Sequence, residues 1–137
     1  MRQIAIHLPI ELPPGPMARW RCDLDQDDRL SWGHGVYDLF GIERDATLDR
    51  DEVVSRYDPR SREALTMLRR HAIASGDGFS LDARIVRSSG EPRWMRVTAH
   101  VERRGDRTVA LCGVKRDISA PVAQLECLGR VRPPALA

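Results

Sequence analysis

The sequence is most unusual in the residues that it lacks. It has 137 residues and no asparagine, and 21 of its 22 basic residues are arginine, so that Lys115 is the only lysine. Asparagine and lysine both need codons rich in A and T, so this bias indicates a bacterial genome rich in G and C. Aromatic residues make up only 5% of the chain. Twenty acidic residues are interspersed with the basic ones and leave a formal net charge of +2, which predicts no nucleic-acid-binding face.

Other absences exclude membrane, disulfide and metal classes. No apolar run approaches the length of a membrane span, and residues 1–16 lack the features of a signal peptide, so we expect a cytoplasmic protein. Cys22, Cys112 and Cys127 are odd in number and show no CxxC spacing, which argues against a disulfide framework. The four histidines are too dispersed for a zinc site. We therefore expect no metal.

The length and the balance of 42% hydrophobic and 31% charged residues fit one globular domain. Apolar residues alternate along residues 4–10, and Pro13-Pro14-Gly15-Pro16 then reads as a joint. The sequence thus predicts a cap or linker over 1–16, a domain over 17–119 and a tail over 120–137.

Within the domain, periodicity and turn residues predict two strands, short helices, one long helix and a three-stranded meander. Gly41 is placed to end a short helix, and Asp58-Pro59 to begin the long one. Residues spaced at i, i+3, i+4 and i+7 give that long helix one apolar stripe. The predicted strands are 17–24, 29–32, 79–85, 95–102 and 108–117, and the long helix is 60–75. This order indicates an α+β fold, an antiparallel sheet with its helices on one face.

Three stretches, in this order, resemble a PAS domain of the subgroup related to PAS fold 3. The first is Leu30–Trp32 followed by Val36–Ile42, which is similar to the family's strand and "LFGY" helix. The second is Tyr57–Arg62, similar to the "HPEDR" entry to the long helix but without its histidine and acidic pair. The third is made of Phe79–Arg87, Gly90–Trp94 and Gly113–Ser119, which are similar to "EYRIRRKDGEYRW" and the terminal "GVxxDIT".

The resemblance implies a five-stranded antiparallel sheet, short helices and one longer helix making a pocket over one face, and a sensory role in signal transduction. Small residues on the sheet would leave room under the helices. The pocket candidates are Phe40, Leu68, Leu81, Ala83, Val97, Ala99, Leu111 and Gly113. We expect no enzyme activity, and a small apolar ligand or a protein partner as the signal.

Cofactor-binding members of the family suggest alternatives. The flavin-binding light-oxygen-voltage domains use an Asn-Cys-Arg motif, which a chain without asparagine does not have. Haem-binding members take a histidine from the long helix, so His71 is the candidate ligand of a haem sensor. From another class, a small cone-like α+β enzyme would need a carboxylate in an apolar cavity, and Asp82 is the nearest analogue, although it falls on the polar phase of its strand. Cofactors therefore remain none or unknown.

An unpartnered apolar segment suggests an interface. Ile4, Ile6, Leu8 and Ile10 have no obvious place in the core, and Trp94 lies on an otherwise polar strand face. We expect these residues to pair with a second copy in a homodimer, or with another PAS-containing or kinase-type signalling protein.

Overall fold

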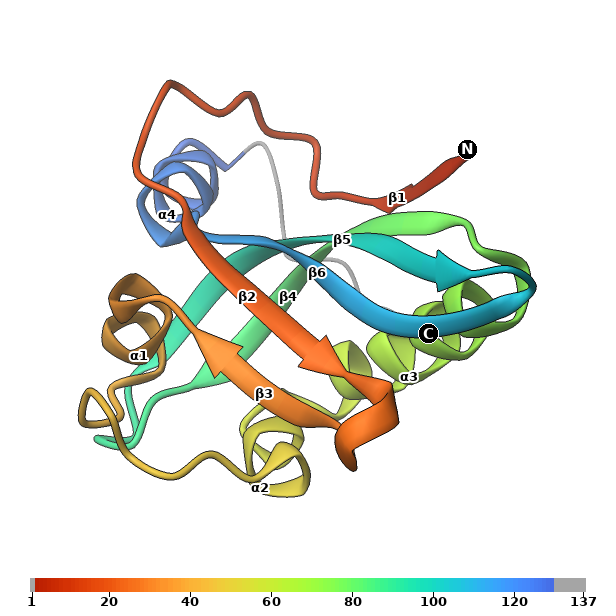
Figure 1. Cartoon of the computed structure of the whole chain (residues 1–137). Helices are drawn as coiled ribbons and strands as arrows, with labels where there is room; N and C mark the ends of the chain where they lie inside the picture. The colour runs from red at the N-terminus through yellow and green to blue at the C-terminus, as the bar shows by residue number, and fades with distance from the viewer. Residues whose placement is uncertain (1, 130–137) are drawn as a thin grey trace.

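A six-stranded sheet forms the centre of the protein in this computed structural model, which describes residues 2–129 (Figure 1). The strands run across the sheet in the order β1-β4-β5-β6-β2-β3. Their bounds are β1 Gln3–Ile6, β2 Ala18–Asp23, β3 Arg29–Trp32, β4 Gly78–Val86, β5 Pro92–Arg104 and β6 Arg107–Asp117. The helices are α1 His34–Phe40, α2 Arg50–Ser55, α3 Pro59–Ser75 and α4 Ser119–Cys127, with a 3-10 turn over Leu24–Gln26. The predicted α+β class is confirmed.

Strands β2 to β6 pair antiparallel, as predicted, but a sixth strand joins them. Strand β1 pairs parallel to β4, from Gln3 opposite Gly78 to Ile6 opposite Leu81. The sheet is therefore mixed, and part of the segment predicted as a linker belongs to it. The physical reason is that β4 would otherwise be an open edge, and an alternating apolar segment satisfies its unpaired backbone groups. The pattern of the segment showed a strand but not its partner.

The long helix begins and ends where its sequence signals lie. The carboxylate of Asp58 accepts hydrogen bonds from the amides of Arg60 at 2.9 Å and Ser61 at 3.4 Å, which caps the exposed N-terminus of α3. Gly76 follows the last turn at φ +83°, a conformation that glycine adopts without strain. Leu68 and Ala72 of the predicted stripe are buried against the sheet.

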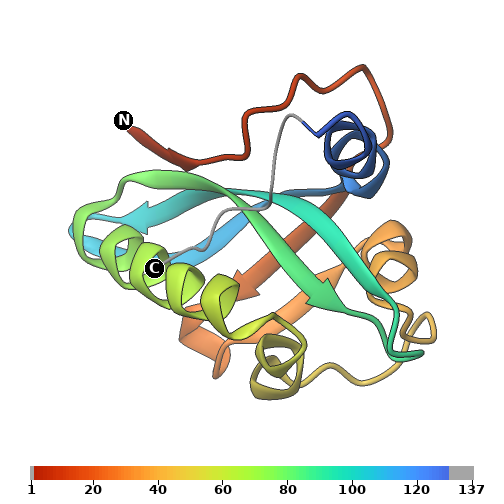
Figure 2. The ribbon, with the colours of Figure 1, turned by 180° about the vertical axis from the view of Figure 1, so that it is seen from behind.

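The two faces of the sheet are covered by different parts of the chain. Helices α1, α2 and α3 lie over one face, here called the inner face, whereas the N-terminal segment and α4 lie over the outer face (Figures 1 and 2). The inner side holds the larger hydrophobic core. A second cluster on the outer side contains Leu8, Ile118 and Val122, flanked by Ile10, Leu12 and Trp94. No helix among residues 2–129 combines the length and the hydropathy of a membrane span.

Candidate functional site

The only lysine of the chain points into the inner core. Strand register places Lys115 of β6 opposite Val97 and Ala18, in the same phase as the inner residues Leu111 and Gly113. Its residue surface is only 7% exposed. The Nζ atom lies 3.4 Å from the hydroxyl of Tyr57, which is itself buried. Among the residues that the structure describes, no carboxylate forms an ion pair with this ammonium.

Aromatic rings surround the lysine in place of a counter-ion. Of the seven aromatic residues in the chain, four have ring centroids within 6 Å of Lys115 Nζ. The distances are 5.4 Å to Trp20, 5.6 Å to Trp32, 5.0 Å to Phe40 and 5.9 Å to Tyr57. The negative face of an aromatic ring attracts a cation, so this aromatic box partly offsets the cost of burying the charge. The box also packs against itself, because Trp32 and Phe40 stack at 5.0 Å.

A cavity of about 50 Å³ opens beside Lys115. Strands β2, β3, β4, β5 and β6 form its floor, and residues of α2 and α3 form its roof. Its apolar wall includes Val97, Leu111, Val53 and Leu65, and its polar lining includes Arg50 and Arg69. A volume of this size holds one or two water molecules or a ligand of a few heavy atoms.

The polar groups of the cavity are arranged as hydrogen-bond donors at neutral pH. Burial lowers the pKa of Lys115 to about 7, because the ammonium loses its hydration shell. Burial likewise raises the pKa of the Tyr57 hydroxyl and of the Cys22 thiol, so both groups keep their protons. The indole N–H of Trp32 is buried and has no hydrogen-bond partner among the described residues, whereas that of Trp20 donates to the carbonyl of Thr98 at 3.2 Å.

The predicted pocket residues lie on the inner side, but only part of the set lines the cavity. Val97 and Leu111 line it, and Phe40 belongs to the aromatic box. Leu68, Leu81, Ala83 and Ala99 pack in the core around it. Gly113 has a separate role, because a Cβ there would collide with the carbonyl of Thr98 on β5.

Lys115 was missed by the sequence reasoning, although a signal for it was present. The sequence analysis predicted the strand over 108–117 but did not follow its alternation to the end. Leu111, Gly113 and Lys115 follow one another at every second position, so they share one face of the strand.

His71 is not placed to serve the cavity. Its side chain is 50% exposed, and its Nε2 lies 3.2 Å from the carboxylate of Asp77 at the end of α3. It does not belong to the residues that line the cavity. Neighbouring residues on a helix point about 100° apart, and the neighbour Ala72 is the one whose side chain points into the core. The geometry therefore does not support His71 as a haem ligand.

Asp82 is buried, but on the outer side of the sheet. The guanidinium of Arg96 donates to its carboxylate through Nε at 2.7 Å and Nη2 at 2.9 Å, and the amide of Leu8 donates at 2.7 Å. These three donors hold the carboxylate as a structural anion. Asp82 therefore does not supply the carboxylate in an inner cavity that the cone-like enzyme alternative needs.

The predicted interface residues find a place within their own chain. Ile4 and Ile6 of β1 pack against the inner core, and Leu8 is only 4% exposed. Ile10 and Trp94 are half-buried beside Leu8 in the outer cluster. The expectation that the segment has no place in the core is therefore wrong, because β1 completes the sheet and the following residues cover its outer face. Residues 3–12 are called the strap below.

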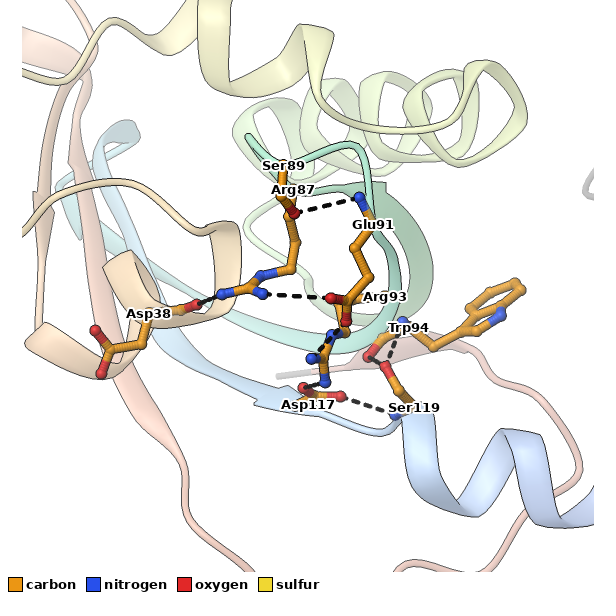
Figure 3. A network of polar contacts seen from close by, with 8 residues as sticks. All are labelled: Asp38, Arg87, Ser89, Glu91, Arg93, Trp94, Asp117 and Ser119. Atoms are coloured by element: carbon orange, nitrogen blue, oxygen red, sulfur yellow. Dashed lines mark hydrogen bonds and ion pairs between the residues drawn. The ribbon is translucent and has the colours of Figure 1, made fainter.

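At the end of β6, a chain of polar contacts connects β5, β6 and the start of α4 (Figure 3). Arg93 of β5 lies 3.2 Å from the carboxylate of Asp117 at the end of β6, and it also pairs with Glu91. Asp117 in turn accepts from the amide of Ser119 at 2.9 Å, at the start of α4. The hydroxyl of Ser119 accepts from the amide of Trp94 at 2.8 Å. The first turn of α4 is thus attached directly to β5 and β6.

The same network reaches the inner helices. Arg87, just after β4, donates through Nη2 to the backbone carbonyl of Asp38 in α1 at 2.9 Å, and its Nη1 lies 3.7 Å from the carboxylate of Glu91 (Figure 3). The Arg87 amide also donates to the carbonyl of Glu91 at 2.8 Å. Individual surface ion pairs of this kind contribute little stability. Here they fix the relative positions of two helices, because they connect α1 on the inner side with the start of α4 on the outer side.

Comparison with solved structures shows many chains with this fold. The N-terminal domain of a diguanylate cyclase with PAS/PAC sensor from Marinobacter aquaeolei superposes with a TM-score of 0.68 at 22% identity, covering 76% of this chain and 96% of that chain. A sensory box histidine kinase/response regulator from Burkholderia thailandensis gives 0.67 at 16% identity, covering 82% and 85%. The LOV domain of a blue-light activated histidine kinase from Erythrobacter litoralis gives 0.59 at 18% identity, covering 82% and 99%.

A search of curated protein sequences finds no match to this chain. Comparison with family profiles, however, agrees with the comparison of structures. The family profile described as PAS fold matches residues 29–113, which is more than half of the chain and runs from β3 to the middle of β6. The chain therefore belongs to the PAS fold family.

Proposed function

We propose that this chain is a non-enzymatic sensory module of a signalling protein, in which occupation of the inner cavity is transmitted along β6 to α4. The similar folds come from a cyclase with a PAS/PAC sensor and from a sensory histidine kinase. The observation that carries the proposal is the position of Lys115. It lines the cavity and stands two residues before Asp117, which binds the amide at the start of α4.

The connection is short and stiff. Between the cavity and α4 the chain is a paired β-strand, and Lys115 and Asp117 share one face of it. A ligand that displaces the Lys115 side chain changes the position of β6 against β2, and Asp117 moves with the same strand. Because the first turn of α4 depends on Asp117 and Trp94, a small shift there changes the stability of the helix.

Amide NMR shifts during a screen of small molecules test this transmission. A binder is expected to shift the amides of Leu111 and Lys115 in the cavity and also those of residues 119–127. Asp117→Asn is expected to leave the cavity shifts in place and to abolish those in α4, whereas Asp106→Asn, in the exposed turn at the other end of β6, is the control. Cavity shifts without any response in α4 of the wild type would contradict the proposal.

Pairing with a second copy, or with another PAS-containing or kinase-type signalling protein, stays a prediction, as does a cytoplasmic location. The strap buries Leu8 within its own chain, so an interface there would form on the surface that the strap and α4 present together. Sedimentation of the whole chain and of a chain lacking residues 1–12 tests the point. A dimer that the deletion dissociates supports a strap-built interface, and a monomer in both contradicts it.

A further inference from the structure

The cavity beside Lys115 contains donors and positive charge but no acceptor to match them. Its ionisable lining consists of Lys115, Arg50, Arg69, Tyr57 and Cys22, and no carboxylate belongs to the described residues around it. Arg69 has a partner outside, because its guanidinium lies 2.8 Å from the carboxylate of Asp28. Within the described part of the chain, Lys115 has only the Tyr57 hydroxyl as a partner, at 3.4 Å. Buried charges in proteins are ordinarily paired, so the missing partner is an anion.

A second, independent observation points the same way. The indole N–H of Trp32, which lines the same cavity, is buried without a hydrogen-bond acceptor among residues 2–129. An unsatisfied buried donor is destabilising, and such groups are rare in folded proteins. Trp32 on β3 and Lys115 on β6 thus line one cavity. Among the described residues the indole N–H has no acceptor, and the amine has only the Tyr57 hydroxyl.

The size and the walls of the cavity limit what the anion can be. A cavity of about 50 Å³ limits the ligand to a small ion of a few heavy atoms in close contact with the walls. Val97, Leu111 and Phe79 give the wall an apolar side, so a methyl or ethyl group has a surface to pack against. A planar carboxylate carries acceptor oxygens enough for both donors.

We propose that this cavity binds a small monocarboxylate of two or three carbons, whose oxygens accept hydrogen bonds from Lys115 Nζ and the Trp32 indole and whose alkyl group packs on Val97 and Leu111. The proposal rests on the proposed sensory function and names the class of its ligand. Acetate and propionate are the representative chemistry. The ligand anion gives Lys115 a counter-ion, which residues 2–129 do not provide.

Binding of the anion is linked to a proton. The groups that face Lys115 are Cys22 on β2, Arg50 on α2, Tyr57 before α3 and Arg69 on α3. The arginines carry a fixed positive charge, and the pKa values of Cys22 and Tyr57 are raised, so Lys115 alone changes its charge near neutral pH. Above pH 7 the anion must bind together with a proton, and its affinity falls by about tenfold for each pH unit.

The single lysine makes the test specific. Protein labelled with ¹³C at lysine Cε gives one resonance, from Lys115, whose position reports the protonation of the amine. Acetate and propionate, titrated at constant ionic strength with chloride, are expected to move this resonance saturably toward its protonated position. The affinity is expected to fall about tenfold between pH 7.5 and 8.5. Lys115→Met, followed through the Leu111 amide, is expected to weaken acetate at least tenfold, and Arg107→Met, an exposed cation on the same strand, is expected to leave it unchanged.

Neutral and inorganic probes separate the alternatives. Acetamide has the shape of acetate without its charge, and nitrate has a planar charge without an alkyl group. Equal binding of acetate to Lys115→Met, equal binding of acetamide, tighter binding of nitrate, or no saturable response to either carboxylate overturns the proposal. If acetamide binds as tightly as acetate and α4 responds, the carboxylate proposal is refuted but the sensory function is supported. Acetate binding through Lys115 without a response in α4 supports the ligand and refutes the transmission.

Discussion

Replacing Lys115 by methionine is expected to make the protein more stable at neutral pH. Lysine has an ordinary pKa of 10.5, and burial in this protein lowers it to about 7. A difference of about 3.5 in pKa corresponds to about 5 kcal/mol between the charged and the neutral form. The folded state is destabilised by up to this free energy at any pH at which the amine is protonated in the unfolded chain. Methionine is close in length, needs no hydration and fills the same space among the rings.

The sign of the pH dependence follows from proton counting. Between pH 7 and pH 10.5 the unfolded chain holds a proton on Lys115 that the folded chain has released. Stability therefore rises with pH across this window, by about 2 kcal/mol between pH 7 and pH 9. Lys115→Met removes this rise and is expected to gain about 3–4.5 kcal/mol at pH 7, which is the cost of about 5 kcal/mol less about 0.5–2 kcal/mol for the lost attraction to the rings.

Urea unfolding at pH 7 and pH 9 measures both quantities, and the difference between the two proteins cancels the titration of every other group. Arg107→Met removes an exposed cation from the same strand, so its stability is expected to keep the wild-type pH dependence. The ¹³Cε resonance of the single lysine gives the titration midpoint directly. A midpoint near the ordinary value for lysine, with Lys115→Met less stable than wild type at pH 7, would show that the amine is hydrated and that the reasoning is wrong.

Three further substitutions test the packing around the site, all by equilibrium unfolding. Leu68→Ala is expected to cost about 2–5 kcal/mol because Leu68 is only 6% exposed in the inner core, and a loss under about half a kcal/mol would mean that the helix faces water. Arg96→Met is expected to cost about 3–5 kcal/mol because it leaves the Asp82 carboxylate buried without its counter-charge, and an additional Asp82→Asn change is expected to restore part of this loss. Gly113→Ala is expected to cost about 3 kcal/mol or more because its Cβ meets the rigid backbone of β5, and a neutral result would refute the close approach of the two strands.

Those parts of the fold that depend on neighbours in sequence were predictable. Strand β3 was predicted with its observed bounds, and the long helix began at Asp58-Pro59 as its capping residues indicated. Both signals act over a few residues, since a cap needs only the next turn and a strand repeats every second position. The inner and outer faces of β4 and β5 followed from the same alternation.

Features that depend on distant segments were not predictable in the same way. Alternation made β1 a strand but could not show that it pairs with β4, more than 70 positions away. Asp82 is on the outer phase as predicted, yet the strap makes it 2% exposed and Arg96 neutralises it. The cavity forms where side chains from five strands and two helices fail to fill the space between them. A local sequence pattern cannot predict such a space, because it depends on segments far apart in the chain. The tail predicted over 120–137 contains all of α4 except its first residue, Ser119, and residues 130–137 lie outside the described part of the chain.

The bias of the chain toward arginine makes the identity of residue 115 informative. Arginine stands at the other 21 basic positions, including Arg50 and Arg69 around the same cavity, and these two are half-buried. A guanidinium cannot lose its proton at any pH the protein meets, so an arginine at position 115 would keep its full charge in the aromatic box. A lysine can become neutral when the cavity holds no anion and charged when it does. The amine therefore suits an interior site whose charge must depend on a ligand. This cavity is such a site, because the described residues give Lys115 no counter-ion and the Trp32 indole no acceptor.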